Sequence, residues 1–326
     1  MSKPDILSKP DILMLRPMMP LVLEQLTERF TLHRLWEQAE PEKYLDEVAP
    51  RIRGVAAGSG HQRIDAAIID RLPNLEIVSS FGVGYDHVDA AHAGSKGVIV
   101  TNTPDVLNEE VADTTIGLLL NTLRQLPQAE RYLRAGKWLE KPFPLTSTLR
   151  DRKIGILGYG RIGKAIARRL DAFGVEVVYH GRSRQDGVPH AHYPTLVEMA
   201  RYVDVLIVII PGGAETNNLV DAKVLEALGP NGVLINVARG TVVDEAALIK
   251  ALQDKTILSA GLDVFAQEPQ VPQELIDMDH VVLLPHVGSA SVHTRNAMGQ
   301  LVVDNLSSWF AGKGPLTAVA ETPFKA

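Results

Sequence analysis

Three side chains with acid, base or anion-binding chemistry follow three successive apolar segments in the second half of the chain. They are Arg239, Glu268 and His286. An imidazole exchanges a proton close to neutral pH, and a carboxylate beside it stabilises the protonated ring. A guanidinium binds a carboxylate through two parallel N–H bonds and keeps its charge at every relevant pH. Together the three side chains indicate a site that moves a proton on a small anionic substrate.

Each of these side chains also has an ordinary structural alternative. An arginine at the end of a strand often makes a surface salt bridge, and a single histidine is usually part of the packing. The apolar segments that precede the three residues are 232–236, 257–261 and 281–284, and we interpret them as parallel strands of one sheet. Because ligands of open α/β sheets bind beyond the carboxyl ends of the strands, a shared edge favours the functional interpretation.

A glycine motif supplies the expected cofactor site. The segment KIGILGYGRIG (153–163) is an apolar run that ends in Gly-x-Gly-x-x-Gly and continues into a helical pattern. Gly158 is expected to allow the tight turn, Gly160 the approach of a diphosphate, and Gly163 the close packing of helix and strand. The diphosphate would bind backbone N–H groups at the helix N-terminus. A plain glycine-rich turn is the alternative.

The residues after segment 175–179 bear on the choice of cofactor. NAD-specific sites place an acidic residue about twenty residues after the glycine turn, where it binds the ribose 2′-hydroxyl. This chain instead reads HGRSR at 180–184, with no carboxylate. Arg182 and Arg184 can pair with a 2′-phosphate, and Ser183 can donate a hydrogen bond to it. The sequence therefore predicts NADPH rather than NADH, with a solvated basic loop as the alternative.

Short apolar segments alternate with helical patterns in two blocks, which predicts parallel sheets covered by helices. Strands are expected at 11–16, 31–36, 51–56, 76–80 and 98–101, and again at 153–157, 175–179, 204–210, 232–236, 257–261 and 281–284. A long helix is expected over 108–136, a connector over 142–148 and a last helix over 291–310. The predicted class is α/β, with a Rossmann-type doubly wound nucleotide-binding domain and a smaller flavodoxin-like α/β substrate domain.

The segment that contains the last helix is too short to form a separate domain, so we expect this helix to pack on the first block of strands and helices. The predicted domains are a discontinuous substrate domain, 1–102 with 290–326, and a dinucleotide-binding domain, 103–289. The sequence SKPDIL occurs at 2–7 and again at 8–13, and we expect the second copy to open the first strand.

The composition is that of a globular protein and narrows the classes of partner. The 326 residues are 45% hydrophobic and 22% charged, with a formal net charge of −6 and no cysteine. The negative charge disfavours a nucleic-acid partner, and the lack of cysteine excludes disulfides and thiolate metal sites. The most apolar run, 203–210, is too short to span a bilayer, and the N-terminus has no secretory pattern. We therefore expect a cytoplasmic protein with no metal site and no membrane partner.

Six motifs occur in one order along the chain. They are FGVGYDHVD (81–89), TNTPD (101–105), LGYGRIG (157–163), NVARG (236–240), DVFAQEP (263–269) and PHVGS (285–289). On these motifs the chain resembles the D-2-hydroxyacid dehydrogenases and, among them, is most similar to the glyoxylate/hydroxypyruvate reductases. The resemblance implies reduction of a small 2-oxo acid to the D-2-hydroxy acid by hydride transfer from NADPH.

The resemblance also implies roles for the matched positions. Arg239 would bind and polarise the substrate, Glu268 would support the acid, and His286 would be the proton donor. The further substrate-binding residues implied are Val83, Gly84 and Ser289, where the backbone of the Val83–Gly84 turn would hold the carboxylate. The cofactor-binding residues implied are Gly158, Tyr159, Gly160, Arg161, Ile162, Gly163, Gly181, Arg182, Ser183, Arg184, Pro211, Thr216, Val237, Ala238, Arg239, Asp263, His286 and Gly288.

The family resemblance further implies a homodimer, in which an arm after the long helix crosses to the partner. Trp138 would line the partner's active site or pack in the dimer contact. A reductase of aromatic or other larger 2-oxo acids is the nearest alternative, and a nucleotide-sensing, co-repressor-like scaffold on the same fold is the alternative from another class. A formate dehydrogenase is disfavoured, because that family has a glutamine at the position of Glu268. A long-form phosphoglycerate dehydrogenase is also disfavoured, because its regulatory domain would lie beyond Ala326.

Overall fold

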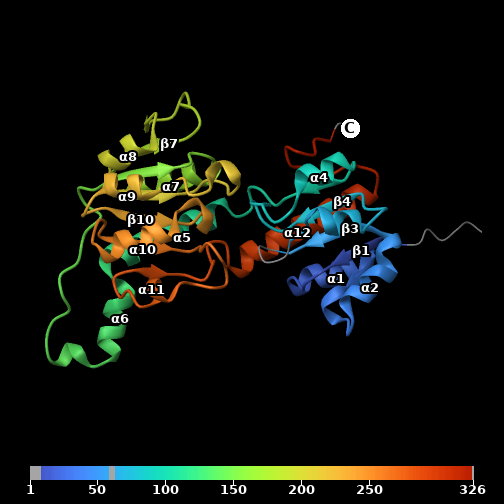
Figure 1. The fold of residues 1–326 in the computed structure, drawn as a ribbon, viewed down its shortest axis with the longest axis horizontal. Coiled ribbons are helices and arrows are strands. Elements are labelled where there is room, and N and C mark those ends of the chain that lie inside the picture. Colours follow the sequence, from blue (N-terminus) through green and yellow to red (C-terminus); the bar gives the residue numbers. More distant parts are fainter. Residues whose placement is uncertain (1–8, 59–62, 325–326) are drawn as a thin grey trace, which may run out of the picture. The chain divides into compact units, whose positions relative to one another are not determined.

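The computed structural model describes residues 9–58 and 63–324. The chain forms two compact units (Figure 1), of which Met1–Leu107 with Ser291–Ala326 is one and Asn108–Ala290 is the other. The first unit is thus discontinuous in sequence. The assignment of separate substrate and dinucleotide roles to 1–102 with 290–326 and to 103–289 stays a prediction.

The first unit is built on one parallel sheet of five strands, in the order β2-β1-β3-β4-β5. This is the doubly wound order of flavodoxin-like folds. The strands are β1 (Asp11–Met14), β2 (Thr31–Arg34), β3 (Ile52–Ala57), β4 (Ile77–Ser80) and β5 (Ile99–Thr101). The helices are α1 (Pro20–Arg29), α2 (Pro41–Val48), α3 (Ala66–Asp70), α4 (Ala90–Ser95) and α12 (Val292–Phe310). Because α12 packs against α1 and β4, the last helix completes this unit.

The second unit is built on a parallel sheet of seven strands, in the order β12-β11-β10-β9-β6-β7-β8. The strands are β6 (Lys153–Leu157), β7 (Glu176–His180), β8 (Ala191–His192), β9 (Val205–Val208), β10 (Val233–Asn236), β11 (Ser259–Leu262) and β12 (Val282–Leu283). The helices are α5 (Asn108–Arg124), α6 (Leu126–Arg134), α7 (Arg161–Ala172), α8 (Leu196–Tyr202), α9 (Ala222–Leu228), α10 (Glu245–Gln253) and α11 (Gln273–Ile276).

Two apolar cores cover the two faces of the seven-stranded sheet. One packs α8, α9 and α10 on the strands, and the other packs α5 and α7. Both faces of the sheet are therefore buried. For this reason β9 and the first three residues of β10 form apolar runs rather than an alternating pattern. The α/β class and the Rossmann-type fold predicted from the sequence are confirmed.

Polar side chains fix where several of these helices begin. Each accepts a backbone N–H bond from the first helical turn, and such a cap stabilises a helix by about 1 kcal/mol. The capping residues are Asp65, Asp89, Thr195, Asp221, Asp244 and Ser291.

One predicted helix differs from the structure, and one short strand was not predicted. The helix expected over 108–136 is interrupted at Gln125, which has a φ of 48° and separates α5 from α6. Pro127, in the first turn of α6, cannot continue the hydrogen bonding of the preceding helix, so one continuous helix was a wrong prediction. The edge strand β8 was also missed, because two residues are too few to show a periodic pattern. The second SKPDIL copy opens β1 at Asp11 as expected, whereas the first lies outside the described residues.

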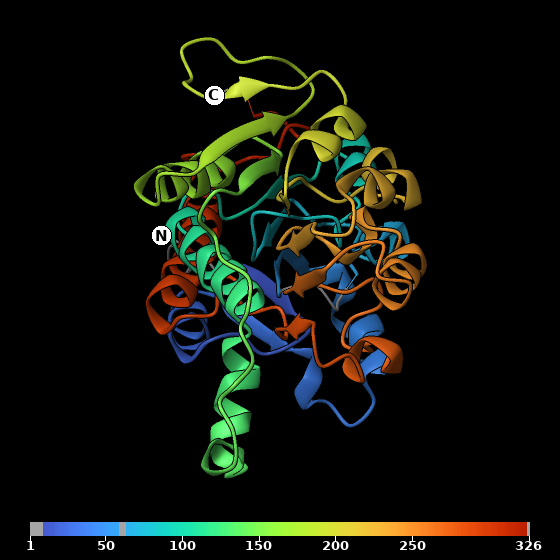
Figure 2. The same ribbon diagram turned by 90° about the vertical axis from the view of Figure 1, so that its left-hand side faces the viewer.

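The segment after α5 leaves large apolar side chains exposed. Figure 2 shows α6 and the chain after it extending beyond the sheet and its covering helices. Tyr132 holds this arm together, since its hydroxyl donates to the carbonyl of Lys141 at 2.9 Å and its ring meets Phe143 edge-on. The exposed fractions are 66% for Trp138, 94% for Leu139 and 102% for Leu145. Within residues 9–58 and 63–324, no helix has the length and apolar character that a membrane span requires.

Candidate active site

Three neighbouring parallel strands end at one edge of the second unit's sheet. β10 pairs with β11, and β11 pairs with β12, each in parallel register. The chain continues from these strands into the loops that carry Arg239, Glu268 and His286. Because parallel strands present their carboxyl ends to the same edge, the three loops start side by side.

The imidazole of His286 and the carboxylate of Glu268 form a close pair. Nδ1 of His286 lies 2.6 Å from Oε2 of Glu268. The other carboxylate oxygen, Oε1, accepts the backbone N–H of Phe265 at 3.0 Å, so the carboxylate is oriented from two sides. The Glu268 side chain is 17% exposed and the His286 side chain 43% exposed. We assign the Nδ1 proton to the bond with the carboxylate, which leaves Nε2 as the nitrogen that exchanges a proton with a ligand.

Asp263 holds the backbone around His286. Its Oδ1 accepts the N–H of Val287 at 2.7 Å, and its Oδ2 accepts the N–H of Gly288 at 2.8 Å. Its own carbonyl accepts the N–H of His286 at 2.9 Å. His286 has a φ of 54°, a left-handed conformation that costs energy in a residue with a Cβ and persists only with such support. Burial raises the pKa of the Asp263 carboxyl, and the two N–H bonds oppose that shift.

The sequence predicted a cofactor contact for Asp263 and did not predict that its carboxylate holds the backbone after His286. The residue is 2% exposed, and its carboxylate is already engaged by two backbone donors. No local pattern signals the contact, because it joins residues 24 and 25 positions apart. A direct contact of Asp263 with the cofactor stays a prediction.

Arg239 lies in a turn that a buried asparagine organises. Asn236, 1% exposed, donates from Nδ2 to the carbonyl of Arg239 at 3.0 Å and accepts the N–H of Ala238 at 3.1 Å. The Asn236 carbonyl also accepts the N–H of Asp263 at 2.9 Å. The guanidinium of Arg239 donates from Nη1 to the carbonyl of Ala238 at 2.7 Å. This network orients the arginine turn relative to the Asp263 segment, and sequence reasoning did not identify Asn236.

Gly240 brings the arginine turn against the backbone that precedes Glu268. A Cβ at Gly240 would lie 1.9 Å from the carbonyl carbon of Phe265 and 2.3 Å from the nitrogen of Ala266. Only a residue without a side chain permits this approach. The position of Arg239 is therefore coupled, through its neighbour, to the segment whose N–H orients the Glu268 carboxylate. Gly240 too was missed, because nothing in the sequence shows which backbone it faces.

The glycine turn after β6 has the geometry expected of a diphosphate cradle. Gly158 has a φ of 103°, and a Cβ there would lie 2.4 Å from the carbonyl oxygen of Ile209. A Cβ on Gly163 would lie 2.1 Å from the carbonyl oxygen of Gly158, so this glycine allows α7 to pack on the turn. At Gly160 a Cβ would meet nothing within 4 Å, and no side chain caps the start of α7. The turn therefore fits a dinucleotide diphosphate.

The side chain of Tyr159, between the first two glycines, belongs to the core. It is 5% exposed, and its ring stacks on Tyr179 with centroids 4.3 Å apart. Any contact of Tyr159 with a cofactor must therefore use its backbone. The other predicted turn residues, Arg161 and Ile162, begin α7.

The basic loop follows β7 at the same edge of the sheet as the glycine turn. The pairing of β6 with β7 sets Leu157 opposite His180, and the N–H of Gly158 donates to the His180 carbonyl at 2.9 Å. Three side chains of the loop are exposed, and none of them makes an ion pair with the described part of the chain; they are Arg182, Ser183 and Arg184. Gly181, just before them, is half-buried.

The remaining predicted cofactor residues lie after β9 and β10. The hydroxyl of Thr216 donates to the carbonyl of Pro211 at 2.8 Å, so the structure brings these two together. Val237 and Ala238 are 7% and 3% exposed and contribute mainly backbone to the edge.

The predicted Val83–Gly84 turn lies in the first unit, after β4. Side chains hold its backbone: Asn102 donates from Nδ2 to the carbonyl of Val83 at 2.8 Å, and Thr103 accepts the N–H of Gly82 at 3.0 Å. His87, which sequence reasoning interpreted as structural, is buried and bonds to the Ser80 hydroxyl at 3.2 Å. The third predicted substrate residue, Ser289, is half-buried in the second unit.

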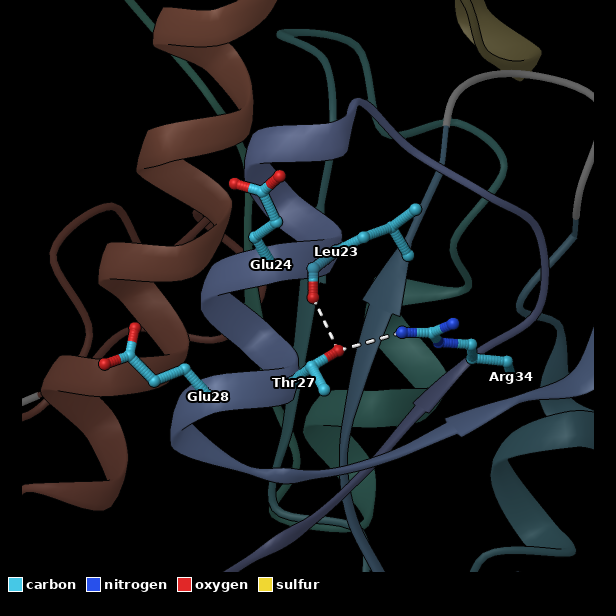
Figure 3. A pocket seen from close by; sticks show the side chains of 5 residues that line it. All are labelled: Leu23, Glu24, Thr27, Glu28 and Arg34. Carbon is cyan, nitrogen blue, oxygen red and sulfur yellow. Dashed lines mark hydrogen bonds between the residues drawn. The ribbon is translucent and has the colours of Figure 1, made fainter.

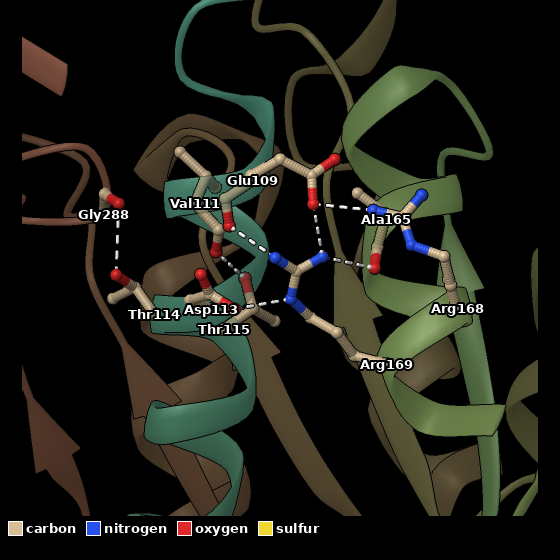
Figure 4. Close-up of polar contacts among 9 residues, drawn as sticks. All are labelled: Glu109, Val111, Asp113, Thr114, Thr115, Ala165, Arg168, Arg169 and Gly288. Atoms are coloured by element: carbon tan, nitrogen blue, oxygen red, sulfur yellow. Dashed lines mark hydrogen bonds and ion pairs between the residues drawn. The ribbon is translucent and has the colours of Figure 1, made fainter. Parts of the chain in front are cut away.

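Helix α5 contacts both α7 and the loop that follows His286 (Figure 4). The hydroxyl of Thr114 donates to the Gly288 carbonyl at 3.1 Å. On the α7 side, Arg169 bonds to Asp113 and to Glu109, at 2.6 and 2.8 Å. α5 therefore supports the loop after His286 and the helix after the glycine turn at once.

A surface groove in the first unit lacks comparable chemistry. Figure 3 shows it, with Thr27 and Arg34 bonded to each other at 3.0 Å beside Glu24 and Glu28. Arg34 is also paired with Glu37. In the part of the chain that the structure describes, no group of three or more His, Cys, Asp or Glu side chains is placed to hold a metal ion.

Comparisons with known proteins agree on one family. Residues 116–288 match the model of the D-isomer specific 2-hydroxyacid dehydrogenase, NAD binding domain. The chain is 48% identical over 308 residues to glyoxylate/hydroxypyruvate reductase A of Arabidopsis thaliana, covering 94% of this chain and 98% of that protein. It is 46% identical over 308 residues to hydroxyphenylpyruvate reductase of Plectranthus scutellarioides, with the same coverage.

A solved structure is similar over nearly the whole chain. It is the NADPH-dependent glyoxylate/hydroxypyruvate reductase of Sinorhizobium meliloti, in complex with NADP and malonate. The two are 55% identical with a TM-score of 0.93, and the match covers 98% of this chain and 99% of that one. The chain belongs to the D-2-hydroxyacid dehydrogenase family, as its motifs predict.

Proposed function

We propose that this protein reduces a small 2-oxo acid of the glyoxylate or hydroxypyruvate type to the D-2-hydroxy acid, with NADPH as the preferred cofactor. The observation that carries the proposal is the 2.6 Å pair of His286 and Glu268 at the edge where the glycine turn also lies. The similarity to reductases of this type at 48% and 55% identity supports the same reaction.

The chain's own residues supply binding and proton transfer. NADPH, when bound, supplies the hydride. Nε2 of His286 donates a proton to the carbonyl oxygen, and the Glu268 carboxylate on Nδ1 stabilises the protonated ring before transfer. Arg239 binds the substrate carboxylate and polarises the carbonyl. In the first unit, the N–H groups of the Val83–Gly84 turn are proposed as donors to a carboxylate. One hydride and one proton convert the ketone or aldehyde to an alcohol.

The cofactor is held at two places on the sheet edge. The Gly158–Gly163 turn binds the diphosphate through backbone N–H groups, and the exposed loop of Arg182, Ser183 and Arg184 binds the 2′-phosphate. The NADP complex of the Sinorhizobium meliloti relative supports this choice of cofactor.

A larger 2-oxo acid is the second candidate substrate. The specific observation in its favour is the 46% identity to a hydroxyphenylpyruvate reductase. Because one methylene in an apolar pocket changes discrimination by only about 1–3 kcal/mol, similar motifs can serve substrates of different size.

A substrate panel tests the proposal. Oxidation of NADPH and NADH is followed with glyoxylate, hydroxypyruvate, pyruvate and phenylpyruvate. We expect the highest kcat/KM with NADPH and either of the first two acids. Turnover of phenylpyruvate alone would establish the second candidate, and no turnover of any acid would favour a nucleotide-sensing scaffold instead.

We further propose a homodimer through the arm after α5, with no nucleic-acid partner. The nearly complete exposure of Leu139 and Leu145, together with exposed Trp138, supports an apolar surface that a second copy covers. Whether Trp138 reaches the partner's site is tested by Trp138→Ala: loss of kcat/KM in an intact dimer supports that role. Light scattering gives the oligomeric state. The cytoplasmic location stays a prediction from the sequence.

A further inference from the structure

We propose that Gln185 is a positioning residue that sets the preference for NADPH by tying the basic loop to the glycine turn. The inference rests on the proposed roles of these two segments and adds a residue that neither motif contains. The backbone N–H of Gln185 donates to the hydroxyl of Tyr179 at 2.7 Å. Its side-chain amide donates to the carbonyl of Tyr159 at 2.8 Å. One residue thus contacts both the strand before the loop and the middle of the glycine turn.

The two tyrosines are fixed independently of Gln185. Tyr179 is 1% exposed in β7, and Tyr159 stacks on it with an interplanar angle of 24°. The Tyr159 hydroxyl bonds to Nδ1 of His190, whose Nε2 bonds to Asp171 of α7 at 2.9 Å. The two tyrosines to which Gln185 bonds are therefore part of the core. The two hydrogen bonds of Gln185, which we call the Gln185 bridge, hold the loop in a fixed position relative to them.

In the part of the chain that the structure describes, the loop makes few other hydrogen bonds. Its three polar side chains, Arg182, Ser183 and Arg184, are exposed. Near its start, Nε2 of His192 and the Gly181 carbonyl are 3.3 Å apart, a long contact. At its far end, Gln185 makes two bonds of ordinary length. Without the bridge, the loop becomes ordered only when a 2′-phosphate binds to it. The free-energy cost of that ordering lowers the affinity for ligands with a 2′-phosphate and not for ligands without one.

The geometry also explains why the effect falls on one cofactor. Gln185 bonds to the cradle at the Tyr159 carbonyl, but close backbone packing at Gly158 and Gly163 fixes the cradle and persists without that bond. The loss of a hydrogen bond and of the order it imposes supports a weakening of about five- to tenfold. We expect this weakening for ligands with a 2′-phosphate and not for those without one.

The test replaces Gln185 by Met, which keeps the length of the side chain and removes its amide donor. Calorimetry measures binding of 2′,5′-ADP and NADP⁺ against 5′-AMP and NAD⁺. We expect the Kd of the phosphorylated pair to rise about five- to tenfold, with less than a twofold change for the other pair and for kcat at saturating NADPH. The matched control is Gln273→Met, which removes a side-chain bond of 2.7 Å to Asp277. Equal weakening of both pairs, or none, would overturn the inference.

A second variant keeps the test valid if Gln185→Met unfolds. Tyr179→Phe removes the acceptor of the Gln185 N–H and leaves the ring in place, so we expect the same selective weakening. Its control is Tyr202→Phe, which removes a hydroxyl bonded to Glu176 at 2.7 Å, at the start of β7. Unchanged selectivity in Tyr179→Phe would count against the bridge.

The double variant Arg182→Ala with Arg184→Ala separates this inference from the proposed function. If it weakens 2′,5′-ADP while Gln185→Met and Tyr179→Phe do not, the basic loop is the phosphate site and the bridge is unimportant. If the double variant has no effect, the proposed phosphate site is wrong, and the inference fails with it.

Discussion

Substitution of Gly240 by Ala tests the coupling between the arginine turn and the Glu268 loop. The new Cβ would lie 1.9 Å from the carbonyl carbon of Phe265 and 2.1 Å from its oxygen. Ordinary contact between carbon atoms begins near 3.5 Å, so the two backbones must separate by roughly 1.6 Å. Both partners are backbone atoms, so no side-chain rotation can relieve the overlap.

The displacement moves both Arg239 and the backbone that orients Glu268. Arg239 precedes the substituted residue, and the N–H of Phe265 orients Oε1 of Glu268. A misplacement of about 1 Å costs on the order of 10²-fold in rate, so we expect kcat/KM for glyoxylate to fall at least about 100-fold. Overpacking of this kind also costs about 1–3 kcal/mol of stability, and each kcal/mol lowers Tm by roughly 2–4 °C in a domain of this size.

The assay follows NADPH oxidation with glyoxylate, with Tm from differential scanning calorimetry. Gly117→Ala is the matched control, because a Cβ at this position in α5 meets nothing within 4 Å. That change favours the helix by roughly 0.5–1 kcal/mol, so Tm should rise slightly and kcat/KM should stay near the wild-type value. A Gly240→Ala enzyme with kcat/KM within threefold of the wild type and the same Tm would refute the reasoning.

Three further predictions concern side chains around the same edge. Thr114→Val removes the donor to the Gly288 carbonyl and should lower kcat about three- to tenfold with little change in the Kd of NADPH. Thr115→Val is the control, because the Thr115 hydroxyl donates to the Val111 carbonyl within α5 at 2.7 Å; equal kcat losses would contradict the role of Thr114 in supporting the loop after His286. Arg239→Lys should lower kcat/KM by at least about 100-fold, because an ammonium cannot make the two parallel bonds; activity near the wild-type level would exclude Arg239 as the carboxylate ligand. Asp263→Asn should change the pH dependence of stability. Burial raises the pKa of the Asp263 carboxyl above its ordinary value of 3.8, so the folded chain binds the carboxyl proton more tightly than the unfolded chain does. The contribution of Asp263 to stability therefore falls as pH rises above 3.8. Relative to the wild type, the variant should therefore gain stability in urea unfolding as pH increases above 3.8; a difference that stays constant with pH would contradict that assignment.

The sequence was sufficient for features that depend on chain order and local pattern. The glycine turn could be predicted because Gly158, Gly160 and Gly163 lie between a strand pattern and a helix pattern. The pairing of His286 with Glu268 followed from their positions after successive parallel strands, and the structure places them 2.6 Å apart.

The missed features depend on contacts between distant segments. Glycine is required at 240 because the Phe265 backbone lies against it. The proposed role of Gln185 depends on its bond to Tyr159, 26 residues earlier in the chain. The break at Gln125 was missed for a different reason, since the apolar pattern of α5 continues across it and only the following proline signals the change.

Single-turnover reduction of glyoxylate by bound NADPH tests the central claim, that His286 is the proton donor. His286→Ala should slow the step by about 10²–10⁴-fold while the Kd of NADPH changes less than twofold. His92→Ala is the matched control, because it also removes an imidazole paired with a carboxylate, that of Asp70 at 2.9 Å, and it should keep the wild-type rate. A His286→Ala enzyme that reduces glyoxylate at the rate of the His92→Ala control would contradict the account.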